Sequence, residues 1–487
     1  MEIYCQIKLK WCFCVFPRFY LNAACVRHTN TITENVEKSL YSMLIINGNE
    51  LNKRGISPSL DIYTRTQICM LLKNCTNLII KELIVAGLYT SLLNPVVNRL
   101  ADTLGYSKPV FAVIIDAGST GSRVLAYTLH KSFVGGHLIL DDELFHEVKP
   151  GLSSFVDNPQ QGAQSILTLL QQAFTVVPEQ YRSATPLLLR ATAGLRLLEP
   201  VAAERLVDTV RAALASSGFK VGADSVEIMD GQDEGIYSWF TVNFLQKRLD
   251  GQATTTALDL GGGSTQITYE PPSVAGLKPL VSVPGAYLNL GLMAVRRGVL
   301  LAQNPEVAKN VESNCINPII REQYWKYANK EYLVSGSQKD IAYLNVAETQ
   351  ISVADKIPIV QMEVCKNIIY TLVKGLMANI PTPTHLQKQH INAFSYYFDR
   401  ASEAGLIDPI AGGKVKVSDF MAASERECQS PNVDQPWACL DLTYISILLQ
   451  EAFKLDPSKE LELRKKIDGH EISWALGLAY NTLVKDL

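Results

Sequence analysis

Two segments of the chain share one local plan, and this repetition limits the possible fold more than any other feature. In each segment an apolar run ends in an aspartate, which is followed by a turn of Gly, Ser and Thr and then by a second strand-like run. The first turn reads DAGSTGS from Asp116, and the second reads DLGGGST from Asp259. The repetition predicts a duplicated unit, with one copy in each of two lobes.

The residue types in these turns suit the binding of phosphate and a metal ion. Glycine lets backbone N–H groups approach an anion closely, and Ser and Thr add hydroxyl donors. A carboxylate at the end of a strand can hold Mg²⁺ or Ca²⁺ through water. Two such turns facing one another could bind successive phosphates with a metal ion between them.

Other phosphate-binding motifs fit less well. No Lys follows the glycines, so neither turn is a Walker P-loop, and no G-x-G-x-x-G run enters a helix, which leaves dinucleotide binding unsupported. A single Gly-rich turn could equally be a tight β-turn. The second copy, with its matched Asp and Ser, favours anion binding.

Length and composition indicate a globular protein of two domains. The chain of 487 residues exceeds one ordinary core, with 47% hydrophobic and 19% charged residues. The net charge of −3 gives no electrostatic basis for nucleic-acid binding. Strand-like and helix-like runs alternate, which predicts an α/β fold. Strands are expected at 110–116, 123–129, 185–194, 254–260 and 265–270, and helices at 160–176, 200–217 and 472–487.

Residues 1–108 differ from the rest, and the sequence assigns them no role. The apolar run 11–16 is short for a signal peptide, and the run 78–97 is interrupted by charges, which leaves it short of the about 18 apolar residues of a clear membrane span. A signal anchor and an amphipathic helix both remain open. Any membrane contact is expected only through such an N-terminal anchor.

Four cysteines lie in the last 175 residues of the chain, at 315, 365, 428 and 439. They permit three disulfide pairings. Pairing in sequence order closes the shorter loops, whereas four buried free thiols are the alternative.

Glu234 lies between the two turns in the segment GQDEGIYSWF (231–240), where apolar residues follow at helical spacing. A carboxylate in the first turn of a helix commonly caps the helix or interacts with its dipole. It could instead be a general base that takes a proton from water attacking a phosphorus atom. The residues around Glu234 leave both interpretations open.

Five motifs occur in order along the chain: DAGSTGSR (116–123), ATAGLRLL (191–198), GQDEGIYSWFTVNFL (231–245), DLGGGSTQITY (259–269) and SWALG (473–477). In these motifs the chain resembles the apyrase family, the nucleoside triphosphate diphosphohydrolases, from residue 109 to its end. The family belongs to the actin, hexokinase and heat-shock ATPase superfamily. Two further segments, FSYYFDRA (394–401) and CLDLTYISILLQEAF (439–453), resemble the smaller soluble or endomembrane members, which favour UDP and GDP.

The resemblance implies two actin-like (ribonuclease H-like) α/β lobes with the nucleotide in the cleft between them. Residues 109–230 plus 465–487 would form lobe I and 231–464 lobe II, with 1–108 as an extension. The segment 270–297 is shorter than the family pattern, and Gly285-Ala286-Tyr287 stands where His-Ser-Tyr is typical.

The resemblance also implies a role for each motif residue. Glu234 would be the catalytic base, Asp116 and Asp259 would hold Ca²⁺ or Mg²⁺ through water, and Ser264 and Gln266 would place the attacking water. It implies the disulfides Cys315–Cys365 and Cys428–Cys439, and hence an oxidising compartment: the lumen of the endoplasmic reticulum or Golgi, or secretion. The phosphate-binding residues would be Ser119, Thr120, Gly121, Arg123, Gly261, Gly262, Gly263 and Ser264.

The expected activity is hydrolysis of the terminal phosphate of nucleoside diphosphates such as UDP and GDP, and of triphosphates. Two alternatives share the superfamily turns. One is a nucleotide-gated binding protein of the heat-shock ATPase type. The other is an exopolyphosphatase, which shares the D-x-G-G-G-S-T turn but against which GQDEGIYSWF and SWALG argue.

Overall fold

The computed structural model describes 108–133, 136–249, 253–270, 286–304, 306, 309–344, 356–380, 382–383 and 385–486. Lys108–Lys131 and His137–Leu487 form one compact unit. Residues 1–107, for which a signal anchor and an amphipathic helix were both open, lie outside the described residues, and so does Gly285. None of the helices in the described ranges is long and apolar enough to cross a membrane.

The first turn belongs to a five-stranded mixed sheet in the order β3-β2-β1-β4-β5. The first three strands are antiparallel, and β1, β4 and β5 are parallel. Two of them, β3 and β5, were not predicted, because β3 carries acidic residues along its length and β5 is only three residues long. The strands are β1 (Pro109–Ala117), β2 (Ser122–Lys131), β3 (Leu138–Val148), β4 (Leu187–Ala191) and β5 (Val226–Ile228).

Helices cover both faces of this sheet because β1 is apolar on both sides. Val113 and Ile115 pack in one core with α4 (Pro159–Leu170) and α7 (Pro200–Leu214), whereas Ala112 and Ile114 pack in another with α8 (Gly231–Leu245) and α14 (Trp474–Asp486). The predicted helix 160–176 ends earlier, at Leu170. A 3₁₀ turn, Ala173–Thr175, then buries Ala173.

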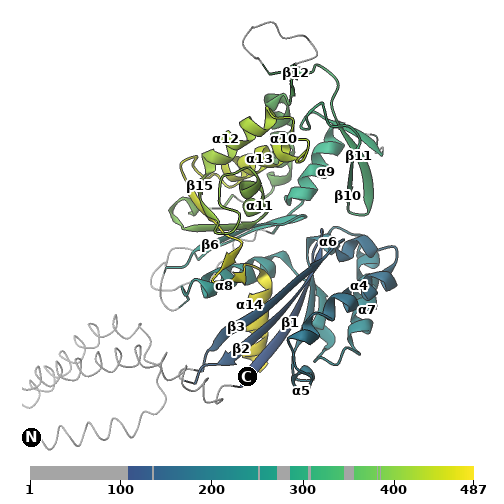
Figure 1. Ribbon diagram of the computed structural model, residues 1–487, viewed down its shortest axis with the longest axis vertical. Helices are drawn as coiled ribbons and strands as arrows, with labels where there is room; N and C mark the ends of the chain where they lie inside the picture. Colours follow the sequence, from purple (N-terminus) through teal and green to yellow (C-terminus); the bar gives the residue numbers. More distant parts are fainter. Residues whose placement is uncertain are drawn as a thin grey trace, which may run out of the picture. The chain divides into compact units, whose positions relative to one another are not determined.

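The second turn belongs to a six-stranded sheet in the order β15-β16-β14-β6-β7-β8. Here β6, β7 and β8 are antiparallel, while β6, β14 and β16 are parallel. This arrangement repeats that of the first sheet, so the predicted duplication and the two-lobed α/β fold are confirmed (Figure 1). The strands are β6 (Thr256–Leu260), β7 (Ser264–Thr268), β8 (Ala286–Leu288), β14 (Ile391–Ser395), β15 (Gly413–Lys416) and β16 (Glu460–Leu463).

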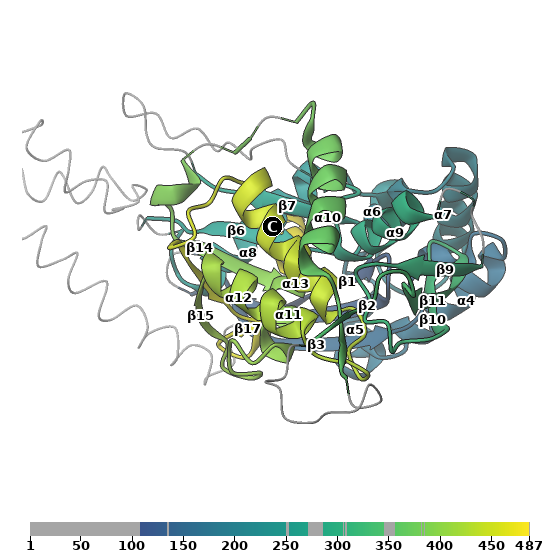
Figure 2. The same ribbon diagram turned by 90° about the horizontal axis from the view of Figure 1, so that it is seen from above.

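The second lobe carries most of the helices that the sequence pattern did not predict (Figure 2). They form its core together with a small sheet of β9 (Asn310–Ser313), β10 (Gln323–Tyr327) and β11 (Lys330–Gly336). The helices are α9 (Leu292–Gln303), α10 (Met362–Met377), α11 (Tyr396–Glu403), α12 (Val417–Cys428) and α13 (Ala438–Ile447), which runs into a π-helical turn, Leu448–Ala452.

Two disulfides join elements of this lobe in the order that the sequence favoured. Cys315–Cys365 ties the segment after β9 to α10, and Cys428–Cys439 ties α12 to α13, each with an S–S distance of 2.04 Å. All four cysteines are buried. The alternative of four free thiols does not describe this structure.

Helix α8 lies between the two sheets. It packs on α14 of the first lobe, where Thr241 Oγ1 accepts a hydrogen bond of 3.0 Å from the Gly477 N–H, and it also contacts β6 and β7. Any side chain at Gly477 would meet the Tyr237 carbonyl oxygen at 2.5 Å, so glycine is needed for this close crossing. Helix α8 therefore contacts both lobes.

A half-buried carboxyl group on β3 makes the stability of the fold pH-dependent. The Glu471 N–H donates to Glu143 Oε1 over 3.1 Å, whereas burial, reinforced by the Glu471 carboxylate, raises the pKa of Glu143 to about 7. The folded state therefore binds this proton more tightly than the unfolded chain does. As a result, the contribution of Glu143 to stability is lost as the pH rises from about 4.5 to 7.

We expect Glu143→Gln, which keeps an acceptor without the charge, to raise the melting temperature at pH 8 by about 1–3 °C. The difference should vanish near pH 4.5. Thermal denaturation followed by circular dichroism at both pH values measures it, with the exposed Glu204→Gln as the control. An equal shift at both pH values would contradict the assignment.

Candidate active site

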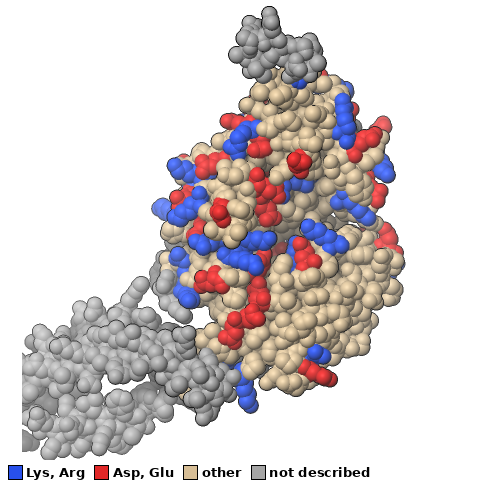
Figure 3. All heavy atoms as spheres, viewed as in Figure 1, with Lys and Arg blue, Asp and Glu red and all other residues tan. Residues whose placement is uncertain are grey.

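A cleft of about 730 Å³ lies between the two sheets and is lined by both turns, the start of α8 and the end of β14. This volume is within the range of small-molecule sites. Lys, Arg, Asp and Glu side chains gather along the hollow between the lobes (Figure 3). The cleft is therefore polar and carries charges of both signs.

Three charged side chains lie side by side across the first sheet at the cleft. Asp116 on β1 pairs in register with Arg123 on β2, which pairs with Glu147 on β3. Arg123 Nη1 lies 3.0 Å from Asp116 Oδ2, and Arg123 Nη2 lies 2.8 Å from Glu147 Oε1. The predicted phosphate ligand Arg123 thus lines the cleft, but its guanidinium is already held between two carboxylates.

The two turns lie against one another, and the segment after β4 lies against the first of them, so glycines stand at these close contacts. A Cβ at Gly262 would lie 2.4 Å from Ser119 Oγ, and one at Gly194 would lie 2.8 Å from Ser119 Cα. The carbonyls of Gly261, Gly262 and Gly263 accept backbone hydrogen bonds from Leu292, Ala294 and Asn289 respectively. Within the described ranges, no backbone oxygen accepts from the N–H groups of Gly262 and Gly263, which leaves two donors for an anion.

The carboxylate of Glu234 is buried in the first turn of α8, where Asp230 takes the capping role by accepting from the Gln232 N–H. Glu234 Oε2 instead pairs with Arg196 Nη2 at 2.7 Å. Burial raises the pKa of Glu234 to about 7; Arg196 opposes this shift, and Asp259 and Asp116 add to it. A carboxylate that titrates near neutral pH suits general base catalysis.

Asp116 and Asp259 are both buried, and each has a carboxylate oxygen, Oδ1, with no hydrogen-bond partner among the described residues. Burial raises the pKa of both groups, that of Asp259 to about 6. Two such oxygens fit a divalent cation, which would offset the cost of burying them. The described residues contain no cluster of three or more His, Cys, Asp or Glu that could bind a metal, so water would complete the coordination sphere.

The structure brings most of the predicted site residues to this cleft. Gly121 and Gln266 are the exceptions. Gln266 is buried behind Ser264 and donates from Nε2 to Ser264 Oγ over 2.8 Å, and Gly121 lies against Glu147. The predicted residues that line the cleft are Asp116, Ser119, Thr120, Arg123, Glu234, Asp259, Gly261, Gly262, Gly263 and Ser264.

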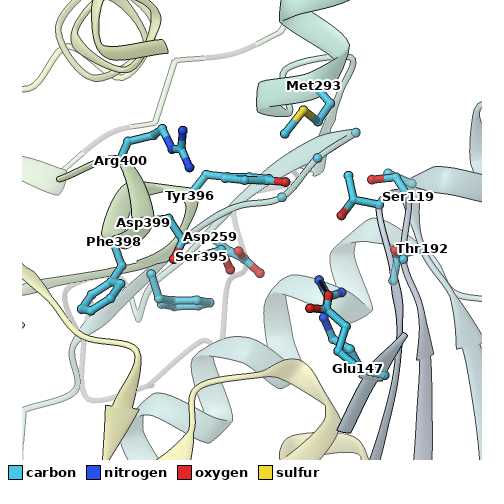
Figure 4. A pocket seen from close by; sticks show the side chains of 18 of the residues that line it. Ser119, Glu147, Thr192, Asp259, Met293, Ser395, Tyr396, Phe398, Asp399 and Arg400 are labelled. Atoms are coloured by element: carbon cyan, nitrogen blue, oxygen red, sulfur yellow. Dashed lines mark ion pairs between the residues drawn. The ribbon is translucent and has the colours of Figure 1, made fainter. Parts of the chain in front are cut away.

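Several residues of the site were not predicted. Thr192 stands opposite Ser395 and Tyr396 in the cleft (Figure 4), and the Ser395 side chain forms a hydrogen bond with Asp259. Ser395 has a φ of 57°, a strained conformation of the kind found at functional sites. Thr192 and Arg196 lie in the motif ATAGLRLL and Ser395 in FSYYFDRA, so the motifs contained the signal although the residues were not singled out.

Comparison with known proteins shows the family of this chain. The model of the GDA1/CD39 (nucleoside phosphatase) family matches residues 106–279 and 285–486. The human protein "Nucleoside diphosphate phosphatase ENTPD5" is 36% identical over 422 residues, which cover 82% of this chain and 91% of that protein. Mouse "Ectonucleoside triphosphate diphosphohydrolase 6" is 37% identical over 398 residues, covering 76% and 81% respectively.

Among solved structures, a nucleoside triphosphate hydrolase from Neospora caninum has the same fold. Its TM-score is 0.50 at 16% identity, over 83% of this chain and 97% of that chain. Family motifs, relatives and fold agree, and the chain belongs to the GDA1/CD39 nucleoside phosphatase family.

Proposed function

We propose that this protein hydrolyses the terminal phosphate of nucleoside diphosphates, UDP and GDP above all, and of triphosphates more weakly. The observation that carries the proposal is the position of the buried Glu234, which lines the cleft together with the two Gly-rich turns. Its pKa is raised to about 7, which suits a general base. The human relative's name, a nucleoside diphosphate phosphatase, supports the diphosphate preference.

In the proposed reaction the N–H groups of Gly262 and Gly263 and the hydroxyls of Ser119 and Thr120 bind the phosphates. Glu234 takes a proton from water as the water oxygen attacks the terminal phosphorus. The bond from that phosphorus to the bridging oxygen breaks, which releases phosphate and a nucleoside monophosphate. A divalent cation held by Asp116 and Asp259 would neutralise charge on the phosphate oxygens.

We assign the nucleobase to the side of the cleft that Tyr396 lines. Three aromatic residues are adjacent in the segment FSYYFDRA: Tyr396, Tyr397 and Phe398. Tyr397 is fully buried in the core of the second lobe, so it cannot contact a base. Calcium and magnesium both suit the two aspartates. The two disulfides support folding in an oxidising compartment, so we further propose a location in the secretory pathway lumen or outside the cell.

Phosphate release from UDP, GDP, ADP, ATP and polyphosphate tests this function. We expect turnover of UDP and GDP at about 1–10³ per second, loss of activity in EDTA and recovery with Ca²⁺ or Mg²⁺. Nucleotide binding with turnover below about one per minute would favour the nucleotide-gated binding protein. Release from polyphosphate but not from UDP would favour the exopolyphosphatase.

A further inference from the structure

Arg196 is the last residue of α6 (Ala193–Arg196) and lies behind the wall of the cleft, largely buried. Its Nη2 donates to Glu234 Oε2 over 2.7 Å and to Ser264 Oγ over 3.1 Å. Its Nη1 donates to the Met229 carbonyl oxygen over 3.0 Å. One guanidinium therefore joins the start of α8 to a strand of the second sheet.

These contacts determine which atoms of Glu234 and Ser264 remain available in the cleft. Arg196 occupies Glu234 Oε2, which leaves Oε1 to accept a proton. Guanidinium groups only donate, so Ser264 Oγ accepts from Arg196, and it accepts from Gln266 Nε2 as well. Because both contacts use lone pairs of Oγ, its own hydrogen must point elsewhere, and Ser264 lines the cleft.

We propose that Arg196 is a positioning residue that holds the Glu234 carboxylate and the Ser264 hydroxyl in one arrangement, so that attacking water meets an acceptor and a donor together. The inference rests on the proposed function, because it takes Glu234 as the base. It explains why a cation that does not line the cleft lies against two residues that do.

The charges around Glu234 give this role a measurable consequence. The charged groups that act on Glu234 are Arg196 from α6, Asp259 from β6 and Asp116 from β1. Arg196 is the cation among them, and it opposes the effect of burial and of both aspartates. Its removal should shift the protonation of Glu234 toward higher pH, whereas mere loss of packing would not.

The test is the pH profile of kcat/KM for UDP hydrolysis in Arg196→Met and Arg196→Lys. In Arg196→Met we expect kcat to fall about 100-fold, a loss typical of misplaced catalytic groups. The acid limb of the pH profile of this variant should move to higher pH by about one pH unit. KM should change less than threefold, since Arg196 does not line the cleft. Arg196→Lys keeps the positive charge but cannot reproduce the contacts of a guanidinium with both Glu234 and Ser264. The acid limb of its pH profile should therefore stay near that of the wild type, while its kcat should lie between those of Arg196→Met and the wild type.

Arg190→Met is the matched control, because Arg190 is an equally buried arginine of the first lobe that pairs with Glu227 and is not among the charged groups that act on Glu234. Its acid limb should not move. An unmoved limb in Arg196→Met, with Glu234→Gln inactive, would overturn the positioning role and leave the proposed function intact. Wild-type activity in Glu234→Gln would overturn both. If Arg196→Met fails to fold, Arg196→Lys still tests the proposal. An acid limb of the Arg196→Lys pH profile that moves to higher pH by one pH unit would contradict it.

Discussion

Replacing Glu234 by glutamine should lower kcat for UDP hydrolysis by about 10²–10⁴-fold, the usual contribution of a general base. Glutamine fills the same buried space and can still accept from Arg196, but it cannot take a proton from water. Binding of UDP, measured by calorimetry, should change little, because Glu234 does not hold the phosphates. The residual activity should also lose the acid limb near pH 7 that the pKa of Glu234 produces.

Asp233→Asn is the control for this experiment. Asp233 lies in the same first turn of α8, but its side chain is exposed. Its replacement should leave kcat within about twofold, because surface substitutions away from a site have small effects. Hydrolysis by Glu234→Gln at the wild-type rate would show that another group activates the water.

The second large effect is expected on stability, at Asp441 in α13. This carboxylate is fully buried and binds Arg296 of α9 through both oxygens, with Nε at 2.8 Å from Oδ1, while Arg400 of α11 approaches Oδ2 at 3.5 Å. Arg296 also stacks on Trp437 at 4.7 Å. Asp441→Ala would leave buried guanidinium charge without its partner and should cost about 3–5 kcal/mol of unfolding free energy.

Urea denaturation measures this loss, with Glu460→Ala as the control. Glu460 pairs with Lys414 at a similar distance of 2.7 Å, but both side chains are more than half exposed. Solvent screens such a pair, so its loss should be much smaller. An equal loss of unfolding free energy in the two variants would mean that the ion pairs of Asp441 with Arg296 and Arg400 do not stabilise the second lobe.

The two predictions differ in how far the sequence alone could reach them. Glu234 could be singled out because it stands between two recognisable turns in an ordered set of motifs. The ion pairs of Asp441 join residues on three helices, and neither α9 nor α11 was predicted as an element. Charge pairs between distant helices have no local signature, because any of the many Arg and Asp residues could be partners.

The residues around the first turn show the same division. The pairing of Asp116 with Arg123 follows from a tight hairpin, in which residues on either side of the turn must face each other. Glu147 enters the same row from β3, an acidic strand that the apolar pattern did not reveal. The sequence therefore predicted Arg123 as a phosphate ligand. In the structure its guanidinium pairs with Glu147 as well as with Asp116.

Residue types at short, regular spacing were enough to predict the two turns, the α/β class and the family. Loop length favoured the disulfide order but left other pairings and free thiols open. The folded structure was needed to show that Asp230 rather than Glu234 caps α8 and that Arg196 bridges Glu234 and Ser264. It was also needed to show which buried oxygens have no hydrogen-bond partner among the described residues. Burial and long-range contacts set the pKa of Glu234. Both arise when segments far apart in the chain pack together, and no local pattern encodes that packing.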